Sequence, residues 1–247
     1  MISFFRKIRQ KLLTQNRVTR YIAYAIGEIV LVVIGILIAL GVNNQNEARR
    51  EAAKERQIIE ALHSEFEENL NSLNYDIGRI KEMVSAQELI LSLINSRDLP
   101  SDDVLDSLLS LALINMTWNP SSYVLNDLKN SGQISKLSNP QLQSLLFGWE
   151  RHYENVIEFA EDDLRSSNSM LEYIKENGSM RNVDSGYLKI RGKQYSRSTF
   201  ELSNSVLLYD INFENVVDDK YTTSVLLLNE YESSIEIIEN ILKATAP

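Results

Sequence analysis

The fold of this chain is decided by the stretch Tyr21-Ile-Ala-Tyr-Ala-Ile-Gly-Glu-Ile-Val-Leu-Val-Val-Ile-Gly-Ile-Leu-Ile-Ala-Leu-Gly-Val42. Glu28 is the one charged residue within it. A bilayer core of about 30 Å needs roughly 20 mostly apolar residues in a helix, so the stretch predicts a transmembrane helix over residues 21–42. The sequence has no second apolar run of this length, which predicts a single membrane pass.

The charges on either side of this helix predict its orientation. The formal net charge is −9, and the first 20 residues carry six basic residues and no acid, so residues 21–247 carry −15. Because basic residues beside a membrane helix stay in the cytoplasm, we expect the N-terminus inside and residues 43–247 outside. The basic end suits anionic lipids, and the acidic part argues against nucleic acid. The six basic residues are Arg6, Lys7, Arg9, Lys11, Arg17 and Arg20.

A cleaved signal peptide is the alternative to an anchor. Signal cores have about 7–15 apolar residues, and the run over 21–42 is longer, so we favour an uncleaved anchor. The chain has no cysteine, which excludes disulfides, thiolate metal sites and thiol catalysis.

Residues 2–13 form a second membrane-related pattern. Phe4, Phe5, Ile8, Leu12 and Leu13 fall on one helical face, with basic residues on the others. This pattern is typical of a helix that lies in the membrane surface. A flexible basic tail is the alternative.

Within the transmembrane helix, Glu28 and the small residues are the candidate functional positions. Small residues at multiples of four let another helix approach closely; they are Ala23, Gly27, Gly35 and Ala39. A carboxyl inside the bilayer is costly and usually faces protein or water. Glu28 can be neutral and hydrogen-bonded, can pair with a partner, or can line a wet pore. Alternatively, it sits near the headgroups of the inner leaflet.

After residue 42 the pattern changes to that of a helical bundle. Residues 43–57 are polar and helix-forming, which predicts a stem that continues the transmembrane helix. An apolar seam with steps of three and four then begins and predicts a helix that ends near Ser96. Its positions are Ile59, Leu62, Phe66, Leu70, Leu73, Ile77, Ile80, Val84 and Leu91.

Local start and stop signals predict the remaining helices over 101–115, 122–130, 140–177 and 218–243, with a short one over 200–208. Residues 179–198 contain two glycines and five basic residues. They predict a solvated loop or, alternatively, a docking surface for an acidic partner. The predicted inner face of 140–177 is Leu142, Leu145, Leu146, Trp149, Tyr153, Val156, Ala160, Leu164, Leu171 and Ile174, and that of 218–243 is Tyr221, Val225, Leu228, Ile235, Ile238 and Leu242.

Two segments resemble a known family. The start, Phe4-Phe5-Arg6-Lys7-Ile8-Arg9, together with residues 24–40 and Asn43-Asn44, is similar to an uncharacterised family of single-pass membrane proteins from flavobacteria and related Bacteroidota. Leu128-Lys129-Asn130-Ser131-Gly132 resembles a second signature of that family. The resemblance implies a Gram-negative inner membrane and a periplasmic domain, and it implies no activity.

Motifs for catalysis or cofactor binding are absent from the sequence. His63 and His152 could meet in a bundle and hold a metal, but we expect each to be half-buried and hydrogen-bonded. The acidic pairs 102–103, 162–163 and 218–219 lack the spacing of a calcium loop and predict helix starts and solvated faces. We expect no enzyme, no cofactor and no metal site.

The sequence thus predicts an all-α protein. Its parts are a basic in-plane segment (1–20), a transmembrane helix (21–42), a stem (43–57) and a periplasmic antiparallel helical bundle (58–247). We expect a non-enzymatic structural or interaction protein that self-assembles or joins a membrane partner. The alternatives are a homo-oligomeric channel with Glu28 facing the pore, and a sensory module that acts through a separate signalling partner.

Overall fold

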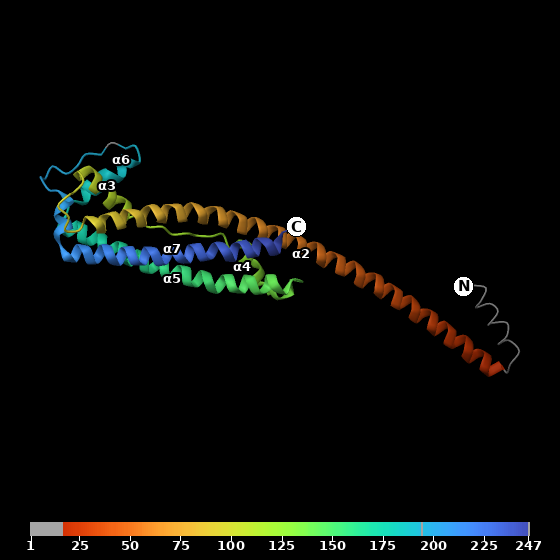
Figure 1. The fold of residues 1–247 in the computed structure, drawn as a ribbon. Helices are drawn as coiled ribbons and strands as arrows, with labels where there is room; N and C mark the ends of the chain where they lie inside the picture. The colour runs from red at the N-terminus through yellow and green to blue at the C-terminus, as the bar shows by residue number, and fades with distance from the viewer. Residues whose placement is uncertain (1–16, 194, 247) are drawn as a thin grey trace. The chain divides into compact units, whose positions relative to one another are not determined.

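A computed structural model of the chain describes residues 17–193 and 195–246, and over these residues the prediction of an all-helical fold is confirmed. The described part contains no strand. The predicted in-plane helix over 2–13 lies outside the described residues. The helices are α2 (Arg17–Leu93), α3 (Asp102–Ala112), α4 (Tyr123–Asn130), η1 (Ile134–Lys136), α5 (Pro140–Asn177), α6 (Met180–Ile190), η2 (Asn204–Tyr209) and α7 (Ile211–Thr245), shown in Figure 1.

The chain divides into two compact units, Met1–Gln57 and Ile58–Pro247. Helix α2 contributes its first part to the first unit and its last part to the second. It ends at Leu93, three residues before the predicted end at Ser96, and Asn95 follows with φ +52°. Asparagine is one of the few side chains that adopts this left-handed backbone at small cost, so it suits a helix end.

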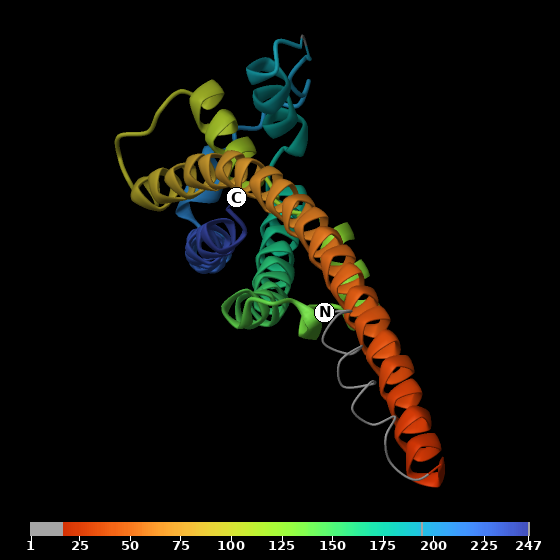
Figure 2. The ribbon, with the colours of Figure 1, turned by 90° about the vertical axis from the view of Figure 1, so that its right-hand side faces the viewer.

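In the second unit, α5 packs closely along α7. Residues 58–93 of α2 lie beside them and share one hydrophobic cluster with both helices (Figures 1 and 2). Contacts between α5 and α7 join His152 to Ser234, Asp163 to Lys220 and Tyr173 to Asp210. The buried apolar residues form two clusters, one containing Trp118, Trp149 and Tyr231, the other containing Ile90, Leu109 and Phe213.

Both predicted ends of α5 are confirmed, and each has a local cause. The Asn139 side chain accepts hydrogen bonds from the backbone N–H groups of Gln141 and Leu142, and Pro140 occupies the first helical position. Proline is favoured there because its missing N–H would be unpaired anyway. The helix closes at Asn177, where the N–H of Gly178 still reaches the Ile174 carbonyl.

Helix α4 receives its cap from α2 rather than from its own sequence. Glu65 is buried, and its Oε1 accepts hydrogen bonds from Ser121 Oγ (2.8 Å) and the Val124 N–H (3.1 Å). Its Oε2 accepts from the Leu125 N–H (3.2 Å). A carboxylate at a helix N-terminus satisfies unpaired N–H groups and complements the helix dipole. The predicted helix end is confirmed, since Gly132 has φ +66°.

Helix α3 is shorter than predicted. It ends at Ala112, not near Asn115, and Ser101 occupies the N-cap position without a side-chain cap bond. The Ser101 carbonyl instead accepts hydrogen bonds from the N–H groups of Val104 and Leu105, both at 3.0 Å.

The prediction of a loop over 179–198 is wrong for its first half, because residues 180–190 form α6. Gly186, one of the two glycines on which the loop prediction rested, lies inside the helix where α6 crosses α3. A Cβ added there would lie 2.9 Å from the Asp106 carbonyl carbon and oxygen. The glycine therefore permits a close helix contact, a requirement that local sequence does not reveal.

Helix α7 begins seven residues earlier than predicted, at Ile211, because the Asp210 side chain caps it by accepting from the Asn212 N–H. Its buried stripe is also different. Of the six predicted inner residues only Ile238 is fully buried, and the others are partly buried. The buried positions of α7 are Phe213, Val217, Lys220, Ser224, Leu227, Tyr231, Ser234, Ile238, Ile241 and Thr245.

The predicted inner face of α5 is correct in its first half and at Ile174, and it is wrong at Leu164. Leu142, Leu146, Trp149 and Val156 are buried, but Leu164 is 45% exposed. The interior position is taken by Asp163, followed by Ser166, Ser167 and Met170. The apolar pattern failed in both helices because polar residues occupy the same level of the interior.

Candidate functional site

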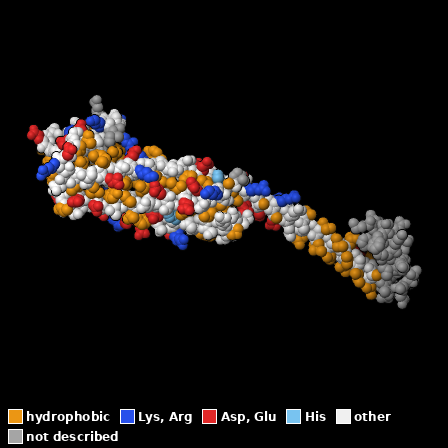
Figure 3. Space-filling view, in the orientation of Figure 1, with side chains coloured by type: hydrophobic (Ala, Val, Ile, Leu, Met, Phe, Trp, Pro, Cys, Tyr) orange, Lys and Arg blue, Asp and Glu red, His pale blue; other side chains and the backbone are white. Residues whose placement is uncertain are grey.

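Residues 21–42 of α2 are apolar on every side and are not covered by the rest of the described chain. The most apolar 18-residue window of this part has a mean hydropathy of 2.8, and none of it is buried. By length and composition the helix can cross a membrane. Figure 3 shows apolar side chains along this part of α2. A helix in the core of a soluble domain would have its apolar side chains buried.

Glu28 shares one face of this helix with only some of the predicted small residues. At about 100° per residue, Gly35, Ala39 and Val42 lie with Glu28 inside an arc of about 60°. Gly27 is about 100° from Glu28, and Ala23 about 140°. The small residues therefore occupy two faces, of which the Glu28 face contains Gly35 and Ala39.

Packing within the chain does not account for the glycines on these faces. A Cβ added at Gly27 or at Gly35 would have no atom of the described residues within 4 Å. Larger side chains would fit both positions as far as residues 17–193 and 195–246 are concerned. If the absence of a side chain matters at either position, it matters to a contact made from outside the chain.

The predicted basic residues of the membrane surface lie at or beyond the edge of the described part. Arg17 and Arg20 belong to the first turns of α2. Arg6, Lys7, Arg9 and Lys11 lie outside the described residues, so their placement stays a prediction.

In the second unit, the structure shows a buried polar layer that sequence reasoning missed. Lys220 is fully buried, and its Nζ donates to Asp163 Oδ1 at 2.7 Å. Ser224 Oγ also donates to Asp163 Oδ1 (2.8 Å) and accepts from Gln87 Nε2 (3.2 Å). We call Gln87, Asp163, Lys220 and Ser224 the buried polar layer. It joins α2, α5 and α7.

The electrostatics of this layer follow from burial. Removal from water lowers the pKa of Lys220, and the Asp163 carboxylate acts in the opposite direction. Two buried oxygens lack a hydrogen-bond partner among the described residues: Gln87 Oε1 in the layer itself, and Ser167 Oγ, one turn after Asp163 on α5. A buried pair of this kind costs desolvation energy, and removal of one partner is more costly still.

A signal for this layer was present in the sequence. Lys220 lies seven residues before Leu227 and three after Val217, so it continues the steps of three and four of an apolar stripe. A lysine in such a stripe needs a buried acid on the facing helix, and Asp163 was read instead as part of a solvated acidic pair.

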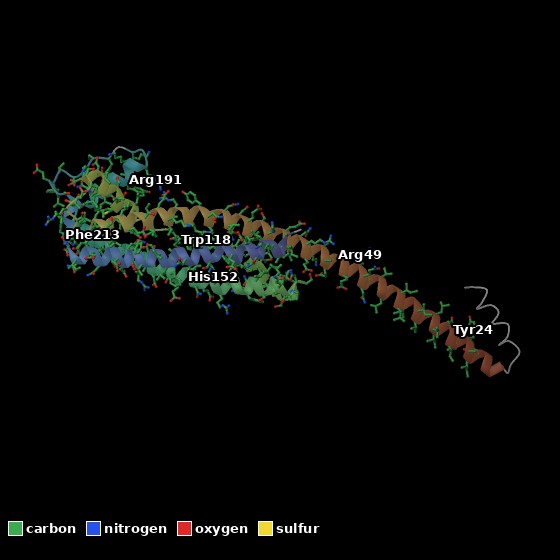
Figure 4. All side chains as sticks on the ribbon, in the orientation of Figure 1. Tyr24, Arg49, Trp118, His152, Arg191 and Phe213 are labelled. Carbon is green, nitrogen blue, oxygen red and sulfur yellow. The ribbon has the colours of Figure 1, made fainter. Side chains whose placement is uncertain are left out.

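The histidine prediction is confirmed in its simpler form. His63 Nδ1 lies 2.9 Å from Thr245 Oγ1, and His152 Nε2 lies 2.7 Å from Ser234 Oγ. Both side chains are half-buried, and they contact α7 at different levels. Figure 4 labels His152 near Trp118, and the ring of His152 lies 6.3 Å from that of Trp149. Among the described residues, no group of three metal-ligating side chains occurs.

The basic residues after Gly178 are partly neutralised within the chain. Arg197 contacts two carboxylates of α3, with Nη1 2.6 Å from Asp103 Oδ1 and Nη2 2.6 Å from Asp106 Oδ2. Hydrogen bonds from Lys189 and Arg197 lower the pKa of Asp103, whereas burial raises the pKa of Asp106. These contacts fasten the segment after α6 onto α3.

A family model described as a family of unknown function, DUF6090, matches residues 28–217. The chain belongs to this family. The predicted membership of an uncharacterised family is thus confirmed. No curated protein and no solved structure matches the chain.

The DUF6090 match includes Glu28, Gly35 and Ala39 of the apolar helix. It also includes Gln87 and Asp163 of the buried polar layer, and it ends before Lys220 and Ser224. Membership of DUF6090 carries no activity with it, so the function has to be argued from the geometry of this chain.

Proposed function

We propose that the chain is a single-pass inner-membrane protein with a cytoplasmic N-terminus and a periplasmic, antiparallel helical bundle. Its work is non-enzymatic: it self-assembles or joins a membrane partner through the transmembrane helix and the bundle. The resemblance to flavobacterial membrane proteins supports the compartment. The six basic residues before residue 21 support the orientation.

The observation that carries the proposal is the uncovered apolar helix over 21–42. Apolar side chains surround it completely, and none of its most apolar window is buried. In water, exposed apolar surface costs about 25 cal/mol for each Å². A lipid environment removes this cost and also suits the length of the segment.

Self-assembly is supported by what lies on the Glu28 face. A carboxyl near the middle of a bilayer costs on the order of 3 kcal/mol, which favours a face turned to protein or water. Gly35 and Ala39 on the same face allow a second helix to approach closely, and close approach favours interhelical hydrogen bonds. Two copies meeting along this face can place their Glu28 carboxyls within reach of each other.

The antiparallel bundle is supported by the contacts between α5 and α7. Residue numbers rise along α5 (152, 163, 173) while those of their partners fall along α7 (234, 220, 210). A bundle of this kind presents long outer faces for interaction. The buried polar layer serves its internal alignment, because Lys220 and Asp163 meet in only one register of the two helices.

The test compares the oligomer mass of the full chain in nanodiscs with that of the Glu28→Leu and Glu28→Gln variants. We expect an oligomer for the natural chain, a changed mass for Glu28→Leu, and a smaller change for Glu28→Gln, which keeps a hydrogen-bonding side chain. A monomer in all three cases contradicts self-assembly through the helix.

The channel is the second candidate, and the position of Glu28 is the observation that favours it. Carboxylate rings select cations in many channels. If Glu28 lines a pore, Glu28→Gln lowers cation conductance across planar bilayers while the oligomer mass stays unchanged. If the Glu28 face is only an assembly contact, neither the natural chain nor the Glu28→Gln variant conducts above the lipid background.

A further inference from the structure

We propose that copies of this chain associate head to tail, through a basic aromatic face on α6 and the segment after it, against an acidic face on α5 of the next copy. The proposal goes beyond contacts in the membrane and rests on the proposed function only in taking self-assembly as the work of the chain. Two surfaces of opposite charge carry it.

The first surface, the basic face, consists of Arg181, Tyr187, Arg191, Lys193 and Tyr195. At about 100° per residue, Arg181 lies about 140° around α6 from Gly186, which packs on α3, and Tyr187 lies about 100° from it. Arg191 directly follows the last residue of α6. All five residues are exposed, and Figure 4 labels Arg191, which follows the end of α6.

Two arginines of the basic face are held against aromatic rings. The guanidinium of Arg181 lies 5.5 Å from the ring centre of Tyr195, and that of Arg191 lies 5.5 Å from the ring centre of Tyr187. Arg181 also donates to the Ser196 carbonyl at 3.0 Å. Cation–π contacts pre-order both side chains, which reduces the entropy lost on binding. Tyrosine and arginine are also the residues that dominate binding energy at interfaces.

The basic face lacks an acidic partner within the described chain. Lys189 and Arg197 form ion pairs with α3, but Arg181, Arg191 and Lys193 form none among the described residues. Phe200, which follows the basic face, is 81% exposed. An exposed aromatic residue beside unpaired cations indicates a contact surface for an acidic, partly apolar partner.

The second surface, the acidic face, lies on α5 and combines acidic with exposed apolar side chains. Phe147, Ile157 and Leu164 are exposed apolar residues that lie within an arc of about 100° around the helix. Between them Glu154, Glu158 and Glu161 are exposed. Another glutamate of α5, Glu150, forms an ion pair with Lys129 of α4. Ion pairs to these three glutamates do not occur within the described residues.

The distribution of charge identifies a second copy as the occupant. Residues 181–197 contain five basic residues and one acid, a net charge of +4. The rest of Ile58–Pro247 contains 10 basic and 29 acidic residues, a net charge of −19. Every copy therefore offers both halves of a complementary pair. Complementary charge favours encounter and sets the orientation of the contact.

The two surfaces are different patches, so the contact is heterologous. A heterologous contact closes into a ring or continues as an open chain, and it leaves one unused surface at each open end. We therefore expect assemblies that grow with concentration and shrink with salt, because exposed charges are screened.

The experiment uses the absence of natural cysteine, since each introduced thiol is then unique. Full-length Lys193→Cys and Glu158→Cys variants are mixed in detergent and treated with a short bismaleimide. Lys193→Cys with Glu239→Cys is the matched control, because Glu239 is an exposed acid of α7. We expect at least a fivefold higher yield of the 193–158 heterodimer than of the control, and a loss of this excess in 0.5 M NaCl.

A charge exchange completes the test. In this test the cross-link joins Tyr195→Cys in one copy to Glu158→Cys on α5 of the other. Arg191→Glu/Lys193→Glu in the first copy abolishes the cross-link. Glu154→Lys/Glu161→Lys in the second copy restores it. Equal yields for the test and control pairs, or no restoration, overturn the proposal and assign the basic face to another partner. The Glu28→Leu variant separates the two ideas. An oligomer mass that Glu28→Leu leaves unchanged, together with an excess of the 193–158 cross-link, contradicts assembly through the Glu28 face alone. A changed mass together with equal yields of the test and control pairs contradicts the head-to-tail contact alone.

Discussion

The apolar part of α2 and the interior of the bundle differ in which side chains they expose and which they bury. In residues 21–42 large apolar side chains are exposed and glycines have free space around them. In the bundle a lysine, an aspartate and a glutamine are buried, and one glycine has no room for a methyl group. The first region is shaped by surroundings outside the chain, and the second by neighbours within it. Substitutions should therefore affect unfolding in the second region and assembly in the first.

The largest effect on unfolding is expected from Lys220→Met. The substitution leaves Asp163 buried without its cation, which costs about 3–5 kcal/mol. The double variant Lys220→Met/Asp163→Leu should regain most of this loss, because both charges are gone. Urea unfolding of the full chain in detergent, followed by the fluorescence of Trp118 and Trp149, measures these differences.

Lys129→Met is the control for this prediction. It removes an ion pair with Glu150 that is largely exposed on the lysine side, so the loss should be much smaller than that of Lys220→Met. If the two lysine variants lose the same stability, the buried polar layer has no special weight in the bundle.

Gly186→Ala should have the next largest effect. The new methyl group would lie 2.9 Å from the Asp106 backbone and would push α6 away from α3, which costs about 1–3 kcal/mol. Gly78→Ala is the matched control in the middle of α2, where an added Cβ meets no atom within 4 Å. It should stabilise the helix by about 1 kcal/mol. Opposite signs of the two changes support the close contact, and equal signs contradict it.

Tyr231→Phe tests the interior through pH. The Tyr231 hydroxyl oxygen accepts a hydrogen bond from the backbone N–H of Trp118 at 3.0 Å. Burial raises the pKa of Tyr231 to about 12. Because the folded-state pKa lies above the unfolded value of about 10, the folded state holds this proton more tightly. The stability contributed is complete below pH 10 and is lost as the pH rises to 12.

The phenylalanine variant should lose about 1–3 kcal/mol at pH 7, where the Trp118 N–H has no acceptor. Its deficit relative to the natural chain should shrink between pH 10 and 12. Tyr173, whose pKa is also raised to about 12 by burial, is present in both proteins and cancels in the difference. A constant deficit across this pH range would show that the Tyr231 hydroxyl titrates normally.

The smallest effect on unfolding, and a large one on assembly, is expected from Gly35→Leu. Free space around Gly35 predicts an unchanged urea midpoint of the bundle. The added side chain blocks the Glu28 face, so the oligomer mass in nanodiscs should fall. Gly27→Leu is the control from the same helix, about 100° away from Glu28. If both variants lose the oligomer, the contact follows the complete stripe of small residues instead of the Glu28 face.

Helix ends were predictable where a local side chain determines them, and not where a distant one does. Asn139-Pro140 and Asn177-Gly178 carry the information for α5 within a few residues, and both ends were correct. Gly186 has the same local signature as a helix breaker, yet its role depends on α3, about 80 residues earlier in the chain. Periodicity alone could not reveal this contact.

The buried faces were predictable only while they remained apolar. The stripe of α2 from Leu62 to Val84 was found, since hydrophobic residues mark most of it, although the buried Glu65 and Asn69 were missed. In α7 the true stripe includes Lys220, Ser224 and Ser234, so a search for apolar residues selected its partly buried neighbours. A buried polar residue is recognisable only when its partner on another helix is known.

The cap that Glu65 places on α4 has a consequence for the order of folding. An isolated helix of eight residues is unstable in water, and three of the hydrogen bonds that begin α4 end on a side chain about 60 positions earlier. The amide hydrogens of Val124 and Leu125 should therefore exchange with solvent only when the Leu62–Leu73 part of α2 opens. In hydrogen exchange, the first amides of α4 should therefore exchange at the rate at which this part of α2 opens.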